Sequence, residues 1–390
     1  MNSRSAVVLI AVAELFGTSL WFTANGVAGA LAAEWGIGVV AVGHLTSAVQ
    51  LGFISGTLLL ALSGLADCYP AARIFFVASL FGAAANVGFA LPGTTLAGAL
   101  AWRFCTGLAL AGIYPLGMKL VVSWAPERAG RAFGWLVGML VLGTSLPHLL
   151  DALAFSMNWR LTVATASVLA ILGGCLVLAI GNGPAHAQTG RFNRGSVLRA
   201  FRQPDFRAAA GGYFGHMWEL YALWAVAPFM LLHALPAQTP PAIVSLSAFA
   251  FIAAGATGCV IGGMASHRIG SARIAFMALL ISGLMCLLYP LLAVFDIQLP
   301  LSVLSLLFLV WGAAVVADSP QFSALVAKHA PPGSIGSALA IVNGIGFFIT
   351  VVSISLLMPL WREQPESALW LLAPGPFIGL LLLRPLARRA

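Results

Sequence analysis

Four ionisable side chains lie well inside long apolar stretches of the sequence: Glu14, Arg103, Glu219 and Asp318. A charge inside an apolar span is costly, and such a residue usually faces a cavity or a partner. A buried carboxylic acid can take up and release a proton, because burial favours its neutral form. An arginine stays charged and binds anions with its forked donors. These residue types predict proton binding by the three acids and anion binding by Arg103.

The first apolar stretch carries a polar stripe, Glu14, Thr18, Trp21 and Asn25, at spacings of four, three and four residues. This spacing puts the four side chains on one face of a helix. We expect that face to line a cavity. The alternative is a hydrogen-bonded contact with a neighbouring helix, since Thr and Asn join helices in membranes.

The second half of the chain repeats this stripe in altered form. Residues 214–216 resemble residues 16–18 at an offset of 198, so that Thr18 corresponds to His216 and Trp21 to Glu219. We expect Glu219 to be the principal proton carrier, with a static buried hydrogen bond as the alternative. The predicted substrate-binding residues are Arg103, Thr18, Trp21, Asn25, Tyr114, His216, Trp218, Tyr221 and Gln321. For each aromatic ring taken singly, core packing is the alternative.

The other candidates lie in the fourth and tenth stretches. Arg103 and Tyr114 share a helical face, and the alternative to anion binding is an ion pair of Arg103 with Glu14 or Asp151. In the segment from Asp318 to Gln321, Pro320 interrupts the helical hydrogen bonds and frees backbone carbonyls. Such backbone is tolerated in a bilayer only beside protein or a cavity.

Membrane-spanning helices must position these side chains, because 61% of the 390 residues are hydrophobic and only 8% are charged. A bilayer core about 30 Å thick needs roughly 20 apolar residues per helix. We predict an all-α integral membrane protein whose first span is permanent rather than a signal peptide. The twelve predicted spans are residues 6–32, 40–65, 72–92, 96–123, 130–152, 159–181, 207–233, 241–265, 272–294, 299–327, 334–360 and 367–384. The five cysteines match no metal site or disulfide framework, and neither a metal nor a cofactor is expected.

The basic residues predict the orientation. With the N-terminus inside and the loops taken alternately, fifteen Lys and Arg residues fall inside and two, Arg160 and Arg362, fall outside. This bias places both termini in the cytoplasm and predicts a multi-pass protein of the cell (inner) membrane. The net charge of +8 then reflects orientation and contact with anionic lipid, and no nucleic-acid partner is expected.

Both halves of the chain contain a polar hinge between apolar stretches. Residues 63–73 and residues 263–273 are related by an offset of 200, with Arg73 matching Arg273 and Asp67 matching His267. Pro115 and Pro320 add a match at an offset of 205. Parallel repeats of this kind are typical of transporters, whose substrate site lies near the midplane between the halves.

These segments resemble motifs of the major facilitator superfamily. The hinge from Gly64 to Arg73 is similar to that family's Gly-x-x-x-Asp-Arg-x-Gly-Arg-Arg loop, although Cys68, Pro70 and Ala72 depart from it. Arg103-Phe-Cys-Thr-Gly107 resembles its Arg-x-x-Gln-Gly pattern, with Thr106 in place of Gln. The chain lacks the Gly-Pro-x-x-Gly-Gly pattern of the family's drug antiporters, which makes export by antiport less favoured.

The resemblance implies twelve transmembrane helices arranged as two pseudo-symmetric six-helix bundles, residues 1–182 and 206–390, joined by a cytoplasmic linker at 183–205. A monomer is the family's usual form. The resemblance also implies charge contacts that close a cytoplasmic gate, and the matching residues are Asp67, Arg73, Arg128, Arg131, His267, Arg268 and Arg273. The alternative for these arginines is simple orientation of the chain in the membrane.

The leading hypothesis is therefore a secondary active transporter that moves a small solute by alternating access, through proton-coupled symport of a small organic or inorganic anion. The alternative is a proton-coupled antiporter that exports an amphipathic or cationic compound. A transport-inactive membrane receptor is the alternative from another class. An enzyme is not expected, because the sequence contains neither His-Glu-x-x-His nor Gly-x-Ser-x-Gly.

Overall fold

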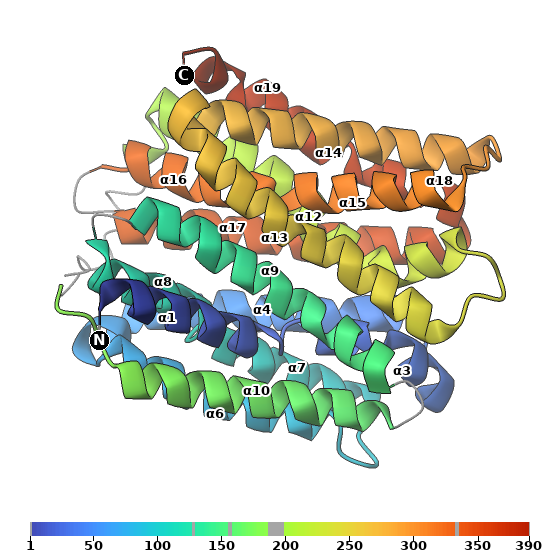
Figure 1. Cartoon of the computed structure of the whole chain (residues 1–390), viewed down its shortest axis with the longest axis horizontal. Coiled ribbons are helices and arrows are strands. Elements are labelled where there is room, and N and C mark those ends of the chain that lie inside the picture. The colour runs from blue at the N-terminus through green and yellow to red at the C-terminus, as the bar shows by residue number, and fades with distance from the viewer. Residues whose placement is uncertain (1, 127–128, 155–157, 186–198, 332–334, 390) are drawn as a thin grey trace. The chain divides into compact units, whose positions relative to one another are not determined.

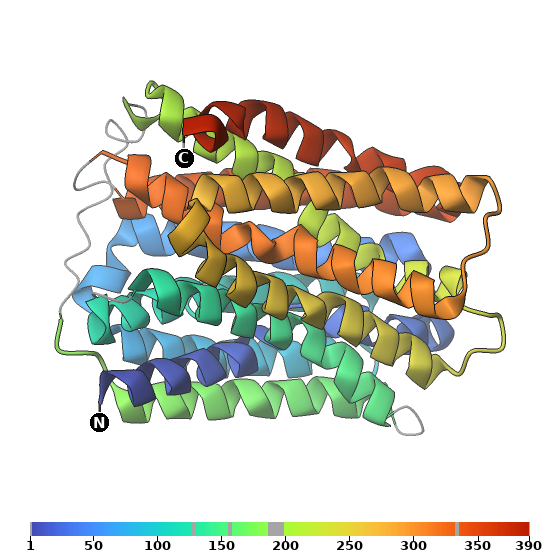
Figure 2. The same cartoon turned by 45° about the horizontal axis from the view of Figure 1, so that its top comes forward.

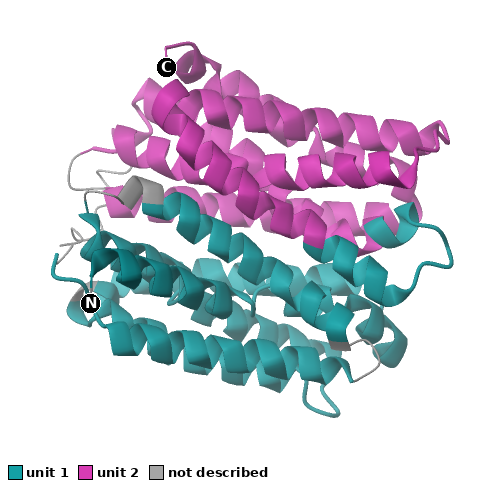
Figure 3. Ribbon diagram, viewed as in Figure 1, with its two compact units in different colours: residues 1–189, 231–249 teal, residues 190–230, 250–390 magenta. Residues whose placement is uncertain are grey.

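The computed structural model describes residues 2–126, 129–154, 158–185, 199–331 and 335–389, and within these ranges the chain is helical without a strand. The chain divides into two compact units (Figure 3). One comprises Met1–Thr189 and Leu231–Phe249, and the other comprises Gly190–Met230 and Ala250–Ala390. The prediction of an all-α fold is confirmed.

The helices of the first unit are α1 (Ser3–Thr18), α2 (Thr23–Gly26), α3 (Ala28–Trp35), α4 (Val39–Ser63), α5 (Leu65–Cys68), α6 (Ala71–Phe89), α7 (Leu96–Leu110), α8 (Tyr114–Trp124), α9 (Ala129–Ala154) and α10 (Trp159–Ile180). Within this unit α4 packs along α7, and α6 packs along α10, as Figure 1 and Figure 2 show for the second pair.

Most residues of α12 (Pro204–Ala234) and α13 (Pro241–Ile269) belong to the second unit. The other helices of that unit are α14 (Ser271–Val294), α15 (Leu301–Ala317), α16 (Ser319–His329), α17 (Ile335–Glu363), α18 (Pro365–Ala368), the short 3₁₀ helix η2 (Leu369–Leu372) and α19 (Pro374–Arg389). Here α14 packs against both α15 and α19.

Eleven of the described helical segments are long and apolar enough to cross a membrane. They match the predicted spans from the second to the last. The first predicted span, 6–32, is divided among α1, α2 and α3, none of which is long enough alone. The count of twelve spans therefore stays a prediction.

The two units repeat one way of packing helices. A side chain at Gly52 would collide with the Phe104 carbonyl, and one at Gly107 would collide with the Val49 carbonyl, so α4 and α7 approach closely through reciprocal glycines. Gly258 and Gly312, at offsets of 206 and 205, pack α13 against α15 in the same way, against the carbonyls of Ala313 and Phe251. The duplicated architecture therefore extends to backbone contacts that the sequence analysis had not identified.

The fourth and tenth predicted spans are also interrupted at equivalent places. The helix α8 begins at Tyr114, and α16 begins at Ser319, 205 residues later. In both helices the next residue is a proline, whose missing N–H suits the first turn of a helix. Each break frees backbone groups inside an apolar span, and the functional candidates lie around these breaks.

Candidate functional site

A buried carboxyl group in the second unit is surrounded by hydrogen-bond donors. Glu219 lies on α12 and is 1% exposed. Its Oε1 accepts hydrogen bonds from Ser282 Oγ, from Trp311 Nε1 at 3.0 Å and from Cys286 Sγ at 3.1 Å. None of the described residues donates to Oε2. The carboxyl group is thus held by one oxygen while the other has no protein partner in the described chain.

Two neighbouring helices supply these three donors. Ser282 and Cys286 are four residues apart on α14, and Trp311 lies on α15. Glu219 was predicted from the sequence, but its partners were missed. The spacing of two small polar residues on one face of an apolar span was an available signal. Nothing in the local sequence marks Trp311 as a donor, because apolar spans commonly contain tryptophan.

His216, one turn before Glu219, joins α12 to the break between α15 and α16. Its Nδ1 lies 2.9 Å from Asp318 Oδ1, and its Nε2 lies 2.8 Å from Ser319 Oγ. His216 and Asp318 are fully buried, whereas Ser319 is half-buried. The structure therefore brings two predicted site residues, one from the substrate-binding set and one from the proton-coupling set, into a single cluster with a serine that was not predicted.

The backbone explains why Asp318 can meet this histidine. The helix α15 ends at Ala317, and Asp318 precedes the first residue of α16. Its carbonyl accepts from the Phe322 N–H at 2.9 Å, so that α16 restarts directly after the break. Gln321, a predicted substrate-binding residue, is also buried.

In the first unit the guanidinium of Arg103 donates its hydrogen bonds to neutral acceptors. Its Nη1 donates to Asn86 Oδ1 at 2.9 Å, and its Nη2 donates to the carbonyls of Leu20, at 3.0 Å, and Trp21. These carbonyls belong to the break between α1 and α2. The alternative of an ion pair with Glu14 or Asp151 was wrong, because the carbonyls freed by this break already occupy the guanidinium. Nε of Arg103 has no partner among the described residues.

Glu14 on α1 is fully buried, and neither carboxyl oxygen has a hydrogen-bond partner in the part of the chain that the structure describes. Gly117 on α8 makes room for this group, since a side chain there would collide with Oε2. A buried polar group without a partner is costly. The role of Glu14 toward a proton or a solute stays a prediction.

The other residues of the first stripe make contacts inside the first unit. Thr18 donates to the Glu14 carbonyl at 2.7 Å, and Trp21 Nε1 donates to Gln50 Oε1 at 3.2 Å. Asn25 Oδ1 accepts from Thr46 Oγ1 at 2.9 Å. Because Gln50 and Thr46 both lie on α4, these contacts favour the alternative of a hydrogen-bonded contact between helices.

The predicted aromatic residues of the second unit also contact protein. Trp218 Nε1 donates to the Leu371 carbonyl at 2.8 Å. The ring of Tyr221 packs against Trp224 and Phe347, with centroids 5.4 and 5.2 Å away. In the first unit Tyr114 is the half-buried first residue of α8. The contacts of Trp218 and Tyr221 agree with core packing and leave their role toward a solute as a prediction.

The predicted cytoplasmic gate is described only in part. Arg128 and the side chains of Asp67 and Arg131 lie outside the described residues. The four described members are all exposed, and none forms a side-chain hydrogen bond or ion pair with another described residue; they are Arg73, His267, Arg268 and Arg273. The gate therefore stays a prediction.

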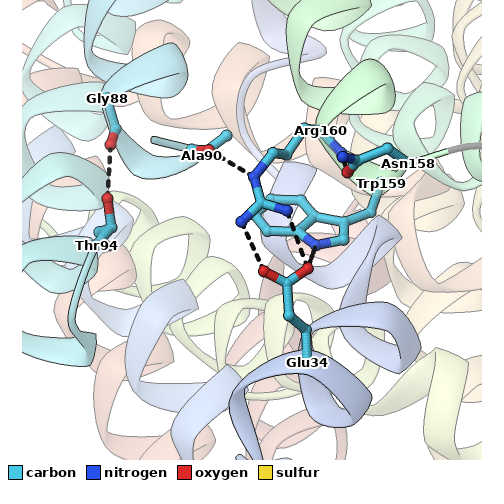
Figure 4. A network of polar contacts seen from close by, with 7 residues as sticks. All are labelled: Glu34, Gly88, Ala90, Thr94, Asn158, Trp159 and Arg160. Carbon is cyan, nitrogen blue, oxygen red and sulfur yellow. Dashed lines mark hydrogen bonds and ion pairs between the residues drawn. The ribbon is translucent and has the colours of Figure 1, made fainter. Parts of the chain in front are cut away.

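A further polar network in the first unit is built on Glu34 at the end of α3 (Figure 4). Arg160 grips its carboxylate with Nη2 at 2.6 Å and Nη1 at 2.9 Å, and Trp159 Nε1 donates to it at 2.6 Å. Arg160 Nε also donates to the Ala90 carbonyl at 3.0 Å. The hydrogen bonds from Arg160 and Trp159 lower the pKa of Glu34 to about 2. This network ties α3 to the ends of α6 and α10.

The described residues contain no group of three or more His, Cys, Asp or Glu side chains arranged to hold a metal ion. The cysteines are free thiols, and Cys286 is the one that donates to Glu219.

The chain matches the model of a known family, and the search of curated proteins found no match. The model that describes the Major Facilitator Superfamily matches residues 9–384. This match spans both units and every predicted span, and it agrees with the helical fold and its eleven long apolar helices. The chain belongs to the major facilitator superfamily.

Proposed function

We propose that this secondary transporter is proton-coupled and that Glu219 carries the coupled proton. Family membership makes the chain a multi-pass membrane protein that moves a small molecule, as a transporter rather than an enzyme. The observation that carries the proposal is the environment of Glu219, a fully buried carboxyl group whose three donors all reach Oε1.

This environment suits a group that changes its protonation state. Burial favours the neutral acid, whereas three hydrogen bonds to one oxygen favour the carboxylate. Oε1 can accept these hydrogen bonds in both states, because the carbonyl oxygen of a neutral acid is also an acceptor. The proton then resides on Oε2, which has no donor among the described residues. Glu14 and Asp318 are proposed as secondary proton sites.

For the transported solute we propose a small organic or inorganic anion taken up by symport, as the sequence indicated. Support comes from the Nε–H of the buried Arg103 guanidinium, which has no hydrogen-bond partner among the described residues. The second candidate is antiport of an amphipathic or cationic compound. A specific observation favours it, since the other Arg103 donors are bound to protein while Glu14 has no partner in the described chain.

Transport would proceed by alternating access, through rocking of the halves 1–182 and 206–390 about linker 183–205. In this proposal Asp67, Arg73 and the matching basic residues close the cytoplasmic side. The protein works as a monomer in the inner membrane, with both termini in the cytoplasm.

The test uses purified protein in liposomes that contain a trapped pH dye, challenged with a panel of small anions and cations. We expect one class of solute to change the internal pH, and we expect Glu219→Gln to abolish that change. The amide keeps an oxygen for the three donors but cannot carry the proton. Glu363→Gln, which removes an exposed carboxylate, is the matched control and should behave as the unmodified protein.

The sign of the pH change assigns the mode of transport. A solute that enters with protons acidifies the lumen, whereas a solute that enters in exchange for protons makes it alkaline. Solute entry without a pH change, or an unchanged response in Glu219→Gln, would overturn proton coupling at this residue. A protein that moves no solute in any panel would support the receptor alternative.

A further inference from the structure

We propose that Ser319, His216 and Asp318 form a proton relay, in which Ser319 passes a proton to His216 and Asp318 balances its charge. The inference deepens the proposed function and rests on it, since the relayed proton is the one coupled to transport. Ser319 Oγ is hydrogen-bonded to His216 Nε2 at 2.8 Å, and His216 Nδ1 lies at ion-pair distance, 2.9 Å, from Asp318 Oδ1.

The three groups differ in burial, and this difference indicates that a proton enters the relay at Ser319. Asp318 and His216 are each 1% exposed, so neither exchanges protons directly with water. Ser319 is half-buried and is the outermost member. The rings of Tyr213 and Phe322 flank the imidazole, with centroids 6.0 and 5.9 Å away. A proton that reaches His216 from water therefore passes through the Ser319 hydroxyl group.

The transfer moves protons between oxygen and nitrogen atoms and breaks no bond to carbon. In the resting state the neutral imidazole donates from Nδ1 to the Asp318 carboxylate, and Nε2 accepts from the Ser319 hydroxyl. When a hydronium ion gives a proton to Ser319 Oγ and leaves as water, the original hydroxyl proton moves to Nε2. Ser319 keeps one hydrogen, His216 becomes an imidazolium, and the net charge of the cluster changes from −1 to 0.

The order of contacts is that of serine, histidine and aspartate in acyl-transfer enzymes, where the imidazole takes the hydroxyl proton and the aspartate stabilises the resulting cation. The same chemistry serves proton transfer when no acyl substrate is present. Histidine is suited to it because its charge changes near physiological pH.

Other titratable groups on the surrounding helices can also contribute to a pH dependence of proton uptake. Asp318 faces the imidazole directly, and Glu219 lies one turn further along α12. No residue of α17 before Arg362 titrates. The remaining groups, by element, are Asp205, Arg207, Tyr213, Tyr221 and His233 on α12, Cys259, His267 and Arg268 on α13, Arg273, Cys286 and Tyr289 on α14, Lys328 and His329 at the far end of α16, Arg362 and Glu363 at the end of α17, and Arg384, Arg388 and Arg389 on α19.

The test measures proton uptake directly and needs no known solute. Detergent-solubilised protein with a pH dye is shifted in a stopped-flow instrument from about pH 8 to about pH 5, the range in which histidine titrates. We expect Ser319→Ala to slow uptake about 100-fold, in line with the loss of a positioned proton-transfer group. We expect His216→Gln to lose an amplitude of about one proton per chain.

Two variants separate a relay from a structural role. Ser319→Thr restores a hydroxyl group and should recover the rate, and Ser323→Ala, on the next turn of α16, should leave it unchanged. Retention of both the rate and the amplitude in Ser319→Ala and His216→Gln would overturn the relay. If Glu219→Gln abolishes coupled transport while Ser319→Ala leaves proton uptake unchanged, the relay fails and the proposed function stands. If Glu219→Gln leaves transport unchanged while Ser319→Ala slows uptake, the proposed function fails and the relay stands.

Discussion

Gly52 and Gly107 join α4 to α7 in the first unit, and Gly258 and Gly312 join α13 to α15 in the second by the same reciprocal backbone contact. The interrupted spans also agree, since α8 and α16 begin 205 residues apart, each with a proline at its second position. Close helix contact through small residues is a common way to pack helices in membranes. The two units therefore share a scaffold.

The polar groups on that scaffold differ. At the offset of 205, Arg103 corresponds to Phe308, Ile113 to Asp318 and Tyr114 to Ser319. The first unit thus contains a cation that cannot lose its proton, bound to an amide and two carbonyls. The second unit contains groups that can titrate, namely Glu219 and the His216–Asp318 pair. The two units therefore share their packing but differ in the polar groups that lie around the equivalent breaks.

The largest effect on stability is expected for Arg103→Leu. This change leaves Asn86 Oδ1 and the Trp21 carbonyl without the donor that Arg103 supplies, and each orphaned buried group costs about 1–3 kcal/mol. The Leu20 carbonyl loses Arg103 but keeps the hydrogen bond from Thr23 Oγ1. We expect a loss of about 3 kcal/mol or more in the free energy of unfolding, measured by denaturation in detergent. The matched change in the second unit, Phe308→Leu, should cost about 1 kcal/mol. Equal losses of unfolding free energy in Arg103→Leu and Phe308→Leu would mean that the hydrogen bonds from Arg103 to the break between α1 and α2 do not stabilise the fold.

An intermediate effect is expected for Gly107→Ala and Gly312→Ala. In each variant the new Cβ collides with a carbonyl of the partner helix, and such overpacking costs about 1–3 kcal/mol. If the two helix pairs are equivalent, both variants should lose a similar amount of unfolding free energy. Gly29→Ala on α3 is the control, because no atom lies within 4 Å of its added Cβ. A large loss in only one unit would show that the two helix pairs are not equivalent.

The sequence predicted the helices well because long apolar stretches between polar turns leave a membrane protein few alternatives. The division of the first span was not predicted. It depends on Arg103, which is more than 80 residues away in the chain and binds the freed carbonyls. Periodicity within one helix cannot indicate which distant donor reaches a break.

The same limit applies to the candidate site. Glu219 and Asp318 were recognised as costly polar residues in apolar spans, but their partners depend on the register between helices. His216 was matched to Thr18 by the repeat, yet its contacts with Asp318 and Ser319 come from α15 and α16. Arg103 was expected to bind an anion, with an ion pair to an acid as the alternative. Its observed partners, the Asn86 side chain and two backbone carbonyls, depend on how α1, α6 and α7 pack.

The smallest effect concerns the two arginines that were predicted outside, one in each unit. Arg160 binds Glu34 through two hydrogen bonds, with side chains 26% and 42% exposed, whereas Arg362 lies 3.3 Å from the adjacent Glu363 with both side chains more than 60% exposed. Exposed pairs contribute about 0–1 kcal/mol, and bidentate geometry places a pair near the upper end. We expect Glu34→Gln to cost about 1 kcal/mol and Glu363→Gln to cost nothing measurable.

The pH dependence of Glu34→Gln sharpens this contrast. The partners of Glu34 lower its pKa from 4.5 to about 2, so the carboxylate stabilises the folded state fully above about pH 4.5. As the pH falls from 4.5 toward 2, Glu34 becomes protonated first in the unfolded chain, and the stabilisation is lost. The difference in unfolding free energy between the unmodified protein and Glu34→Gln should therefore be constant from about pH 5 to about pH 7 and shrink in acid. A difference that stays constant down to about pH 2 would mean that the network stabilises the protein by packing of Arg160 on Trp159, whose ring lies 4.5 Å from the guanidinium, rather than through the charge of Glu34.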